Sequence, residues 1–185
     1  MSTRHRVLVV LALLAGIAAS SCDNGDPAAP AAPTTLALEA TTSTSISPPV
    51  SAADGEVFTI RPWFLTDAGL VQGEPRFVQG PDVLASTLDQ LLSGPTDTDR
   101  FFGLGTGISP RVRVRSAVLD GDTVTVDLDR SFETADTQPQ VAQVVWTLTE
   151  LQGVQKVKFL IDGEDNGATG VRPMGRADTR VQPAG

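Results

Sequence analysis

The sequence has few of the side chains on which most enzyme chemistry depends. Its 185 residues include one cysteine, Cys22, one histidine, His5, and no tyrosine. His5 lies in a segment that we expect to be removed, so no imidazole would remain to activate a serine or cysteine nucleophile. A zinc site of cysteine and histidine ligands is excluded for the same reason. We therefore expect no catalytic residue, no cofactor and no metal site.

Familiar catalytic and nucleotide-binding loops are missing as well. The sequence contains no Gly-x-Ser-x-Gly or Ser-x-x-Lys motif and no Walker loop. Lysine is scarce, with only Lys156 and Lys158. Without residues 1–21, the chain has 12 basic and 22 acidic residues, a formal charge of −10. Such a charge argues against nucleic acid as a partner and against docking on anionic lipid through the protein surface.

The N-terminus resembles an export signal. Arg4 and Arg6 precede an apolar run from Val7 to Ala19, and Ala19-Ser20-Ser21 leads directly into Cys22. The run is too short for a membrane-spanning helix, which needs about 20 residues, and suits the core of a signal peptide. The pattern predicts a bacterial lipoprotein signal at 1–21, with lipid on Cys22. The mature chain would then be anchored at the extracytoplasmic face of the cell membrane. The alternative is an ordinary secretory signal that leaves Cys22 as a free thiol.

Composition divides the remainder into three parts. Residues 22–54 are rich in Pro, Ala, Ser and Thr and cannot bury enough apolar surface to order themselves, so we expect a disordered tether. Residues 55–163 carry the periodic apolar patterns of one domain. Residues 164–185 are expected to form an irregular tail, with one short strand near Arg180-Val181.

Apolar spacing predicts the elements of that domain. Strands are expected over 57–65, with Pro62 as a kink, and over 70–78. A helix opens at Pro81-Asp82 and ends at Gly94-Pro95, with Leu84, Leu88, Leu91 and Leu92 on one face. Residues 96–110 form a glycine-rich loop. A hairpin turns at Asp120-Gly121, with Val112, Val114, Ser116 and Val118 on one face and Val124, Val126 and Leu128 on the returning strand. A second helix spans 139–151, and Val157, Phe159 and Ile161 mark a last strand.

The resulting order is β-β-α-β-β-α-β. Each helix has a single apolar stripe, and most strands have a single apolar face. The expected fold is α+β, a two-layer sandwich in which a mixed sheet is covered on one face by two helices.

Several segments resemble the GerMN domain of sporulation and germination lipoproteins. They are Leu91-Leu92-Ser93-Gly94-Pro95, the hairpin from Val114 to Asp129, the helix sequence Gln143 to Thr149, and the run from Gly153 to Gly163. Arg76 matches an arginine that the family tends to show after its second strand. The resemblance covers about 57–163 and implies an extracytoplasmic, non-catalytic assembly or recruitment module. It implies no catalytic residue. No companion domain is expected after it, which sets the chain apart from relatives that carry one.

Four residue sets are candidates for function. Arg111, Arg113 and Arg115, with Lys156 and Lys158, would form a basic face for an acidic partner if their strands share a sheet; otherwise they guard an exposed face. The hairpin carboxylates Asp120, Asp122, Asp127 and Asp129 are either turn residues or an acid–base pair for glycoside hydrolysis. Asp162-Gly163-Glu164-Asp165-Asn166-Gly167 faintly resembles a calcium loop but lacks the final glutamate. The aromatics form either a ligand shelf or core packing: Trp63, Phe64, Phe101, Phe102 and Trp146.

These observations favour a lipid-anchored binding or assembly module of the cell envelope. It would act through the sheet face or the 96–110 loop. Its partners would be the membrane, through the lipid, and an envelope protein or an anionic wall polymer. A carbohydrate-active hydrolase that uses the hairpin carboxylates is the alternative, and a structural spacer is a third possibility.

Overall fold

The computed structural model describes residues 47–133, 136–165 and 172–185. The described residues all belong to one compact unit. The predicted signal peptide, Cys22 and residues 22–46 of the predicted tether lie outside them. Residues 47–54, which we also expected in the tether, are hydrogen-bonded to the domain. The Gln152 N–H donates to the Pro48 carbonyl at 2.7 Å, and the Leu84 N–H donates to that of Val50 at 3.0 Å.

The N-terminal strands form a long hairpin that is broken in the middle of both arms. Each of the two predicted strands is two strands, paired antiparallel as β1 with β4 and β2 with β3. Pro62 has no N–H to donate, but its carbonyl accepts the Gly73 N–H at 2.8 Å and keeps the halves in register. A side chain at Gly73 would lie 2.8 Å from the Phe64 ring, so this break needs glycine. The strands are β1 Val57–Ile60, β2 Trp63–Thr66, β3 Gly69–Gln72 and β4 Arg76–Gln79.

The three remaining strands form a mixed sheet, as predicted, but the first hairpin does not join it. β5 Val114–Asp120 pairs antiparallel with β6 Thr123–Leu128, and β6 pairs parallel with β7 Lys156–Ile161. The hairpin turns where the sequence predicts, but its two loop residues are Gly121 and Asp122, because Asp120 still pairs with Thr123 at the end of β5. The pairing register of β5 shifts between Val114 and Ser116, which leaves Arg115 as the extra residue of a β-bulge. Our assignment of Ser116 and Val118 to the apolar face is therefore wrong, because both side chains are exposed beyond the bulge.

Both predicted helices are present. α1 Val83–Leu92 begins at Asp82, whose carboxylate accepts the Ala85 N–H at 2.9 Å. The α1 residues Leu84, Leu88 and Leu91 are buried, as their spacing predicted. α3 Gln138–Leu148 connects the parallel strands β6 and β7 and carries Pro139 in its first turn. A short helix, α2 Asp97–Phe101, lies in the segment that we expected to be a loop.

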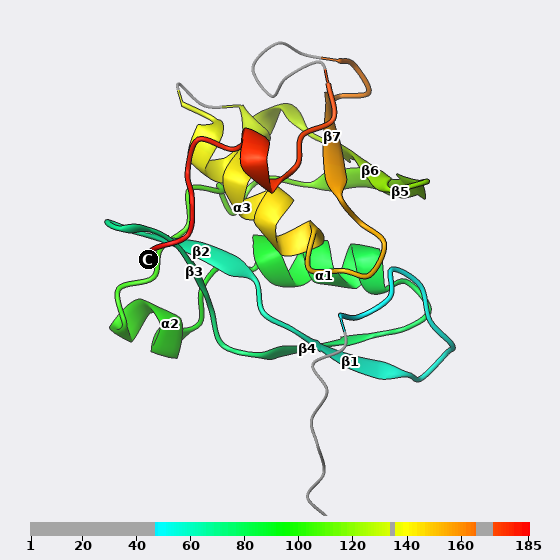
Figure 1. The fold of residues 1–185 in the computed structure, drawn as a ribbon, viewed down its shortest axis with the longest axis horizontal. Helices are drawn as coiled ribbons and strands as arrows, with labels where there is room; N and C mark the ends of the chain where they lie inside the picture. The colour runs from blue at the N-terminus through cyan, green and yellow to red at the C-terminus, as the bar shows by residue number, and fades with distance from the viewer. Residues whose placement is uncertain (1–46, 134–135, 166–171) are drawn as a thin grey trace, which may run out of the picture. The chain divides into compact units, whose positions relative to one another are not determined.

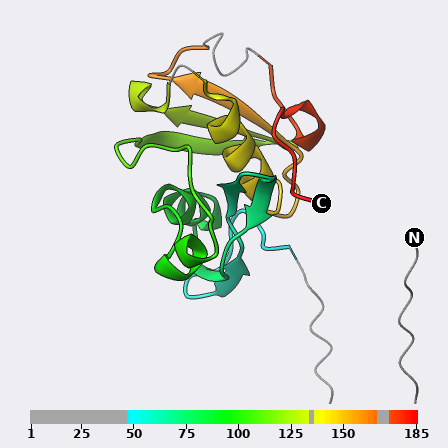
Figure 2. The same ribbon diagram turned by 90° about the vertical axis from the view of Figure 1, so that its left-hand side faces the viewer.

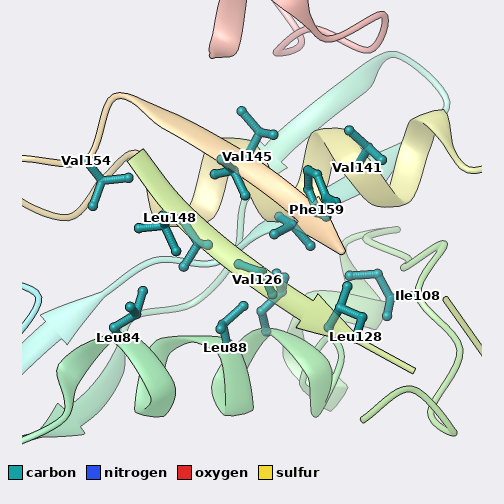
Figure 3. Close-up of a cluster of buried hydrophobic side chains, with 14 of the residues drawn as sticks. Leu84, Leu88, Ile108, Val126, Leu128, Val141, Val145, Leu148, Val154 and Phe159 are labelled. Atoms are coloured by element: carbon teal, nitrogen blue, oxygen red, sulfur yellow. The ribbon is translucent and has the colours of Figure 1, made fainter. Parts of the chain in front are cut away.

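The core lies between the inner face of the mixed sheet and the two long helices. α1 contacts β5, α3 contacts β7, and the two helices contact each other (Figure 1). Leu84 and Leu88 of α1 point toward the sheet, with Leu88 beneath Val126 of β6, and Leu128 of β6 lies beside Ile108 (Figure 3). The Phe132 and Phe159 rings stack with their centroids 5.8 Å apart. The α+β class, with two helices on one face of a mixed sheet, is confirmed.

The C-terminal residues are not a free tail. A 3-10 helix, η2, spans Arg176–Asp178. The short strand expected near Arg180-Val181 is not formed, because both residues lie in bends. Isolated bridges instead pair Met174 with Val157 and Pro183 with Leu70. Figure 2 shows this red segment beside α3, ending next to the β2–β3 strands.

Candidate functional site

The most distinctive surface lies on α2, which projects at one corner of the domain (Figure 1). The helix begins with a capping box. The Asp99 N–H donates to the Thr96 hydroxyl oxygen at 3.0 Å, and the Thr96 N–H donates to the Asp99 carboxylate at 2.9 Å. Thr96-x-x-Asp99 is the sequence signature of such a start, and it could have predicted this helix.

Asp99 joins α2 to the β3–β4 connection. Its side chain is buried, and it also accepts the Glu74 N–H at 2.8 Å. Burial alone would raise the pKa of Asp99. The backbone N–H groups of Thr96 and Glu74, the Thr96 hydroxyl and the Arg76 guanidinium outweigh that effect and hold the pKa below its ordinary value of 3.8. Asp99 is therefore an ionised carboxylate fixed inside the fold.

Arg76 neutralises this carboxylate and ties α1 to α2. Its guanidinium lies 3.4 Å from the Asp99 carboxylate and donates to the Ser93 hydroxyl at 2.9 Å and the Gly94 carbonyl at 2.7 Å. It also donates to the Gln90 carbonyl and lies 5.1 Å from the centre of the Phe64 ring. A planar side chain with several donors is suited to binding three helix-end groups at once. The arginine expected from the family resemblance thus anchors residues 96–110, which we call the α2 segment.

Two glutamines of α3 hold the other end of the segment. The Gln143 side chain is fully buried; its carbonyl accepts the Gly107 N–H at 2.8 Å and its amide donates to the Trp63 carbonyl at 3.2 Å. The Gln140 amide donates to the Gly107 carbonyl at 2.8 Å. Between the two ends, Gly105 and Leu65 exchange two backbone hydrogen bonds, of 2.7 and 2.9 Å. The segment is therefore preorganised by buried polar contacts at both ends.

This fixed segment presents two aromatic rings to solvent. Phe101 is 84% exposed and Phe102 is 71% exposed, with their rings edge to face at 5.3 Å. We call these two residues the aromatic pair. Single exposed apolar side chains are ordinary, but neighbouring large ones on a rigid support indicate an interaction surface. Of the two interpretations of the five aromatics, core packing holds for three of them, since Phe64 is core and Trp63 packs on Trp146 at 5.1 Å, so the five do not form one ligand shelf.

Two depressions border Arg100, the residue that precedes the pair in the sequence. One, of about 600 Å³, lies between β4, the end of α1 and the start of α2, and Phe77 on its wall is 72% exposed. The other, of about 330 Å³, lies between the end of α1 and the segment that follows α2, and Leu92, Leu104 and Ile108 line it. Arg100 borders both depressions and pairs with Asp97 at 2.9 Å. The α2 surface thus combines protruding rings with hollows that could receive a partner's side chains.

The predicted basic face is largely compensated by aspartates. Arg115 pairs with Asp162 at 3.0 Å, Lys156 with Asp122 at 3.2 Å and Lys158 with Asp165 at 3.0 Å. Their strands do share the mixed sheet. Arg111 and Arg113 are exposed, and the Arg113 guanidinium donates to the Pro110 and Val112 carbonyls, each at 3.1 Å. This face is therefore of mixed charge rather than basic, which makes it a weaker candidate than the α2 surface.

The hairpin carboxylates serve structural contacts. The Asp122 carboxylate accepts hydrogen bonds from the Thr123 hydroxyl and the Lys156 ammonium, and both lower the pKa of Asp122. The general acid of a glycosidase needs a raised pKa. Asp127 accepts the Gly163 N–H at 2.9 Å and lies 3.5 Å from Arg115. Asp129 caps a 3-10 helix by accepting the Ser131 N–H at 3.1 Å, and Asp120 is exposed at the turn. This arrangement does not favour the hydrolase alternative.

The acidic turn after β7 is only partly described. Asp162 pairs with Arg115 and with Arg130, so its charge is already balanced. Asn166 and Gly167 of the suggested calcium loop lie outside the described residues. Within 47–133, 136–165 and 172–185, no three side chains of His, Cys, Asp or Glu are grouped to hold a metal ion. The same ranges contain no helix long and apolar enough to cross a bilayer.

Replacing Gln143 with leucine should loosen the α2 segment. The change leaves the Gly107 N–H and the Trp63 carbonyl without their partner, so we expect a loss of about 2 kcal/mol in the free energy of unfolding and faster amide exchange at Gly107. Urea denaturation and hydrogen exchange measure the two effects. Gln152, an exposed glutamine, is the control: Gln152→Leu should change neither. Equal stability of both variants would contradict the anchoring role.

The ionised state of Asp99 predicts acid sensitivity. Because its pKa is lower in the folded chain than the unfolded value of 3.8, its contribution to stability is complete well above pH 3.8. The contribution falls as the pH drops below that value and is lost once the folded pKa is passed. Asp99→Asn removes this titration. Urea denaturation between about pH 6 and pH 2.5 should therefore show a shallower decline for the variant than for the parent. Identical declines would refute this role.

Comparison with known proteins gives a consistent picture. Residues 63–167 match a family model described as Germane, sporulation and spore germination. No curated protein matches the chain. Among solved structures, the tandem GerMN domains of the Bacillus subtilis sporulation protein GerM are similar at 19% identity and a TM-score of 0.52, over 70% of this chain and 48% of that one. The chain thus spans about half the length of that protein, and the likeness shows a shared fold.

Two further structures are similar at lower scores. A candidate lipoprotein from Clostridium perfringens has 16% identity and a TM-score of 0.48, with 72% of this chain and 99% of that one covered. The first GerMN domain of the Bacillus subtilis protein alone has 19% identity and a TM-score of 0.46, with 66% and 98% covered.

Proposed function

Because the chain belongs to the Germane family of sporulation and spore germination domains, of GerMN type, we propose that it is a non-catalytic binding module of the bacterial cell envelope. The observation that carries this proposal is the aromatic pair, held out to solvent by a segment whose two ends are fixed by buried polar contacts. A fixed surface loses little conformational entropy on binding, which favours affinity. The module binds its partner and catalyses no reaction.

The module is anchored at the extracytoplasmic face of the cell membrane through lipid on Cys22. The sequence of a basic start, a short apolar run and small residues before Cys22 supports this placement. A similar solved structure is described as a candidate lipoprotein, which agrees with it. The residues between Cys22 and the domain tether the module to the bilayer, so that its effective concentration near other envelope components is high.

The partner is an envelope protein with an apolar cleft that receives Phe101 and Phe102. Aromatic anchors seated in a pocket supply most of the energy of typical protein interfaces. The two depressions that Arg100 borders can accept side chains from the partner, and Arg100 offers a rim charge. An anionic wall polymer is less suited, because aspartates already pair with three of the five cations of the sheet face.

Replacing both aromatic residues with serine tests this assignment. Phe101→Ser/Phe102→Ser should leave stability within about 0.5 kcal/mol, since both rings are exposed. It should weaken partner capture by about 30-fold, the loss of roughly 2 kcal/mol expected for an aromatic anchor. Co-purification from detergent-solubilised envelopes measures capture, and denaturation measures stability.

A matched control is Val118→Ser, which removes an exposed apolar residue from the sheet face. It should capture the partner as the parent does. If the double variant also retains its partner while Arg111→Glu/Arg113→Glu loses it, the binding surface is the sheet face. If none of these variants changes capture or cell phenotype, the spacer interpretation holds instead.

A further inference from the structure

Residues 172–185 lie beyond the segment that matches the family model, yet they return to the domain and pack on it. In Figures 1 and 2 this red segment runs beside α3 and ends next to the β2–β3 strands. We call residues 172–185 the C-terminal latch. Its contacts fall on three places: the free edge of β3, the outer side of α3, and the edge of β7, where Met174 and Val157 exchange two backbone hydrogen bonds of 2.8 Å.

At β3 the latch takes the position of an added strand. The Leu70 N–H donates to the Gln182 carbonyl at 2.9 Å, and the Ala184 N–H donates to the Leu70 carbonyl at 2.8 Å. The approach is close, because a Cβ atom on Gly69 would lie 2.4 Å from the Gln182 carbonyl oxygen. Gly69 also has a φ of +135°, a conformation that favours glycine. The edge of β3 is thus shaped to accept an extended backbone.

At α3 the latch is held by one arginine and one threonine. The Arg176 guanidinium lies 4.6 Å from the centre of the Trp146 ring, and it donates to the Glu150 carboxylate at 2.6 Å and the Thr149 hydroxyl at 2.7 Å. The Trp146 indole N–H donates to the Thr179 hydroxyl at 3.1 Å. Stacking on an aromatic ring with a charge-assisted hydrogen bond is a specific way of recognising arginine.

The latch is attached mainly through polar contacts. Thr179 is its one buried residue, and the rest are half-buried or exposed. Met174 is its member that packs on the hydrophobic core. Segments that bury little apolar surface open at a lower free energy than the core they cover. The latch can therefore lift while the domain stays folded.

We infer that the β3 edge at Leu70, together with Trp146 of α3 and Glu150 just beyond the end of that helix, is a strand-addition site for an extended peptide, and that the latch occupies this site in cis. The ligand is an extended segment with an arginine that stacks on Trp146 and a backbone that pairs with Leu70 about six residues later. Strand addition of this kind draws affinity from main-chain hydrogen bonds and specificity from side-chain pockets. The site is separate from the α2 surface, and a partner segment gains access when the latch lifts.

The test uses the full chain with latch variants, so that the site itself is unchanged. Arg176→Ala removes the guanidinium that stacks on Trp146 of α3, and Ala184→Pro removes the N–H that donates to the Leu70 carbonyl. Arg172→Ala is the control, because Arg172 pairs with Asp178 inside the latch. Two readouts are followed: amide exchange at Leu70, and anisotropy of a labelled synthetic peptide of residues 172–185.

Both latch variants should speed exchange at Leu70 about tenfold over the control, without change at core amides such as Val126. The labelled peptide should bind both variants at least tenfold more tightly than it binds the parent or the control. A peptide with Arg176→Ala should bind about tenfold more weakly to the same variants. If Leu70 exchanges only together with the core in every variant, or if the latch lifts and no peptide binds, the inference is wrong.

Discussion

Replacing Arg76 with alanine is expected to lower the free energy of unfolding by about 3–5 kcal/mol, the usual cost of removing one partner of a buried ion pair. The change leaves the buried Asp99 carboxylate without its counter-charge. It also removes the guanidinium that donates hydrogen bonds to the Ser93 hydroxyl and the Gly94 carbonyl at the end of α1. Since whole domains are stable by only about 5–15 kcal/mol, the loss is a large part of the total.

Urea denaturation of the parent, Arg76→Ala and Arg100→Ala measures this effect. Arg100 is the matched control, because its pair with Asp97 is exposed and should contribute less than about 1 kcal/mol. Arg76→Lys should give an intermediate loss, since an ammonium group keeps the charge but cannot bridge three helix-end groups. A loss for Arg76→Ala as small as that for Arg100→Ala would show that Arg76 does not anchor the α2 segment.

Replacing Cys22 with serine is expected to move the whole protein from the membrane fraction to the soluble fraction. Two acyl chains bind a bilayer stably because each buried methylene group contributes about 0.8 kcal/mol, and serine cannot take the thioether-linked lipid. The net charge of −10 after removal of 1–21 offers no electrostatic attraction to an anionic surface. Fractionation and immunodetection measure the distribution.

Ser21→Ala is the matched control for this experiment. It keeps a small residue before the cleavage site and keeps Cys22, so the protein should stay in the membrane fraction. Mass spectrometry of the N-terminal peptide should find acylated Cys22 in the parent and in this control. A Cys22→Ser variant that remains in the membrane fraction would show that the anchor lies elsewhere.

The long elements could be predicted because each carries its own local signal. α1 has a capping aspartate, a leucine stripe and a Gly-Pro stop, and the β5–β6 turn has Gly121, which adopts a φ of +60°. The breaks in the first hairpin were harder to predict, because Pro62 and Gly73 weaken the strand pattern and nothing in the sequence shows that strand pairing resumes beyond them. The bulge at Arg115 has no local signal at all, and it reverses the faces of Ser116 and Val118.

Only part of the candidate site could be predicted from the sequence. The 96–110 segment and its two phenylalanines could be named, but whether a phenylalanine packs or protrudes depends on tertiary neighbours that spacing does not reveal. The roles of Gln143 and Arg76 were out of reach for the same reason, as their partners lie 36 and 23 residues away in the chain. The charge balance of the sheet face likewise needed the register of β5, β6 and β7.

Photo-crosslinking in intact cells tests the central claim most directly. A photoreactive phenylalanine analogue at position 102 keeps the ring and its exposure, and the same analogue at position 118 samples the exposed sheet face. The account predicts one discrete cross-linked envelope protein from position 102 and none from position 118. A discrete product from position 118 alone, or no product from either position, would contradict the assignment of the aromatic pair as the binding surface.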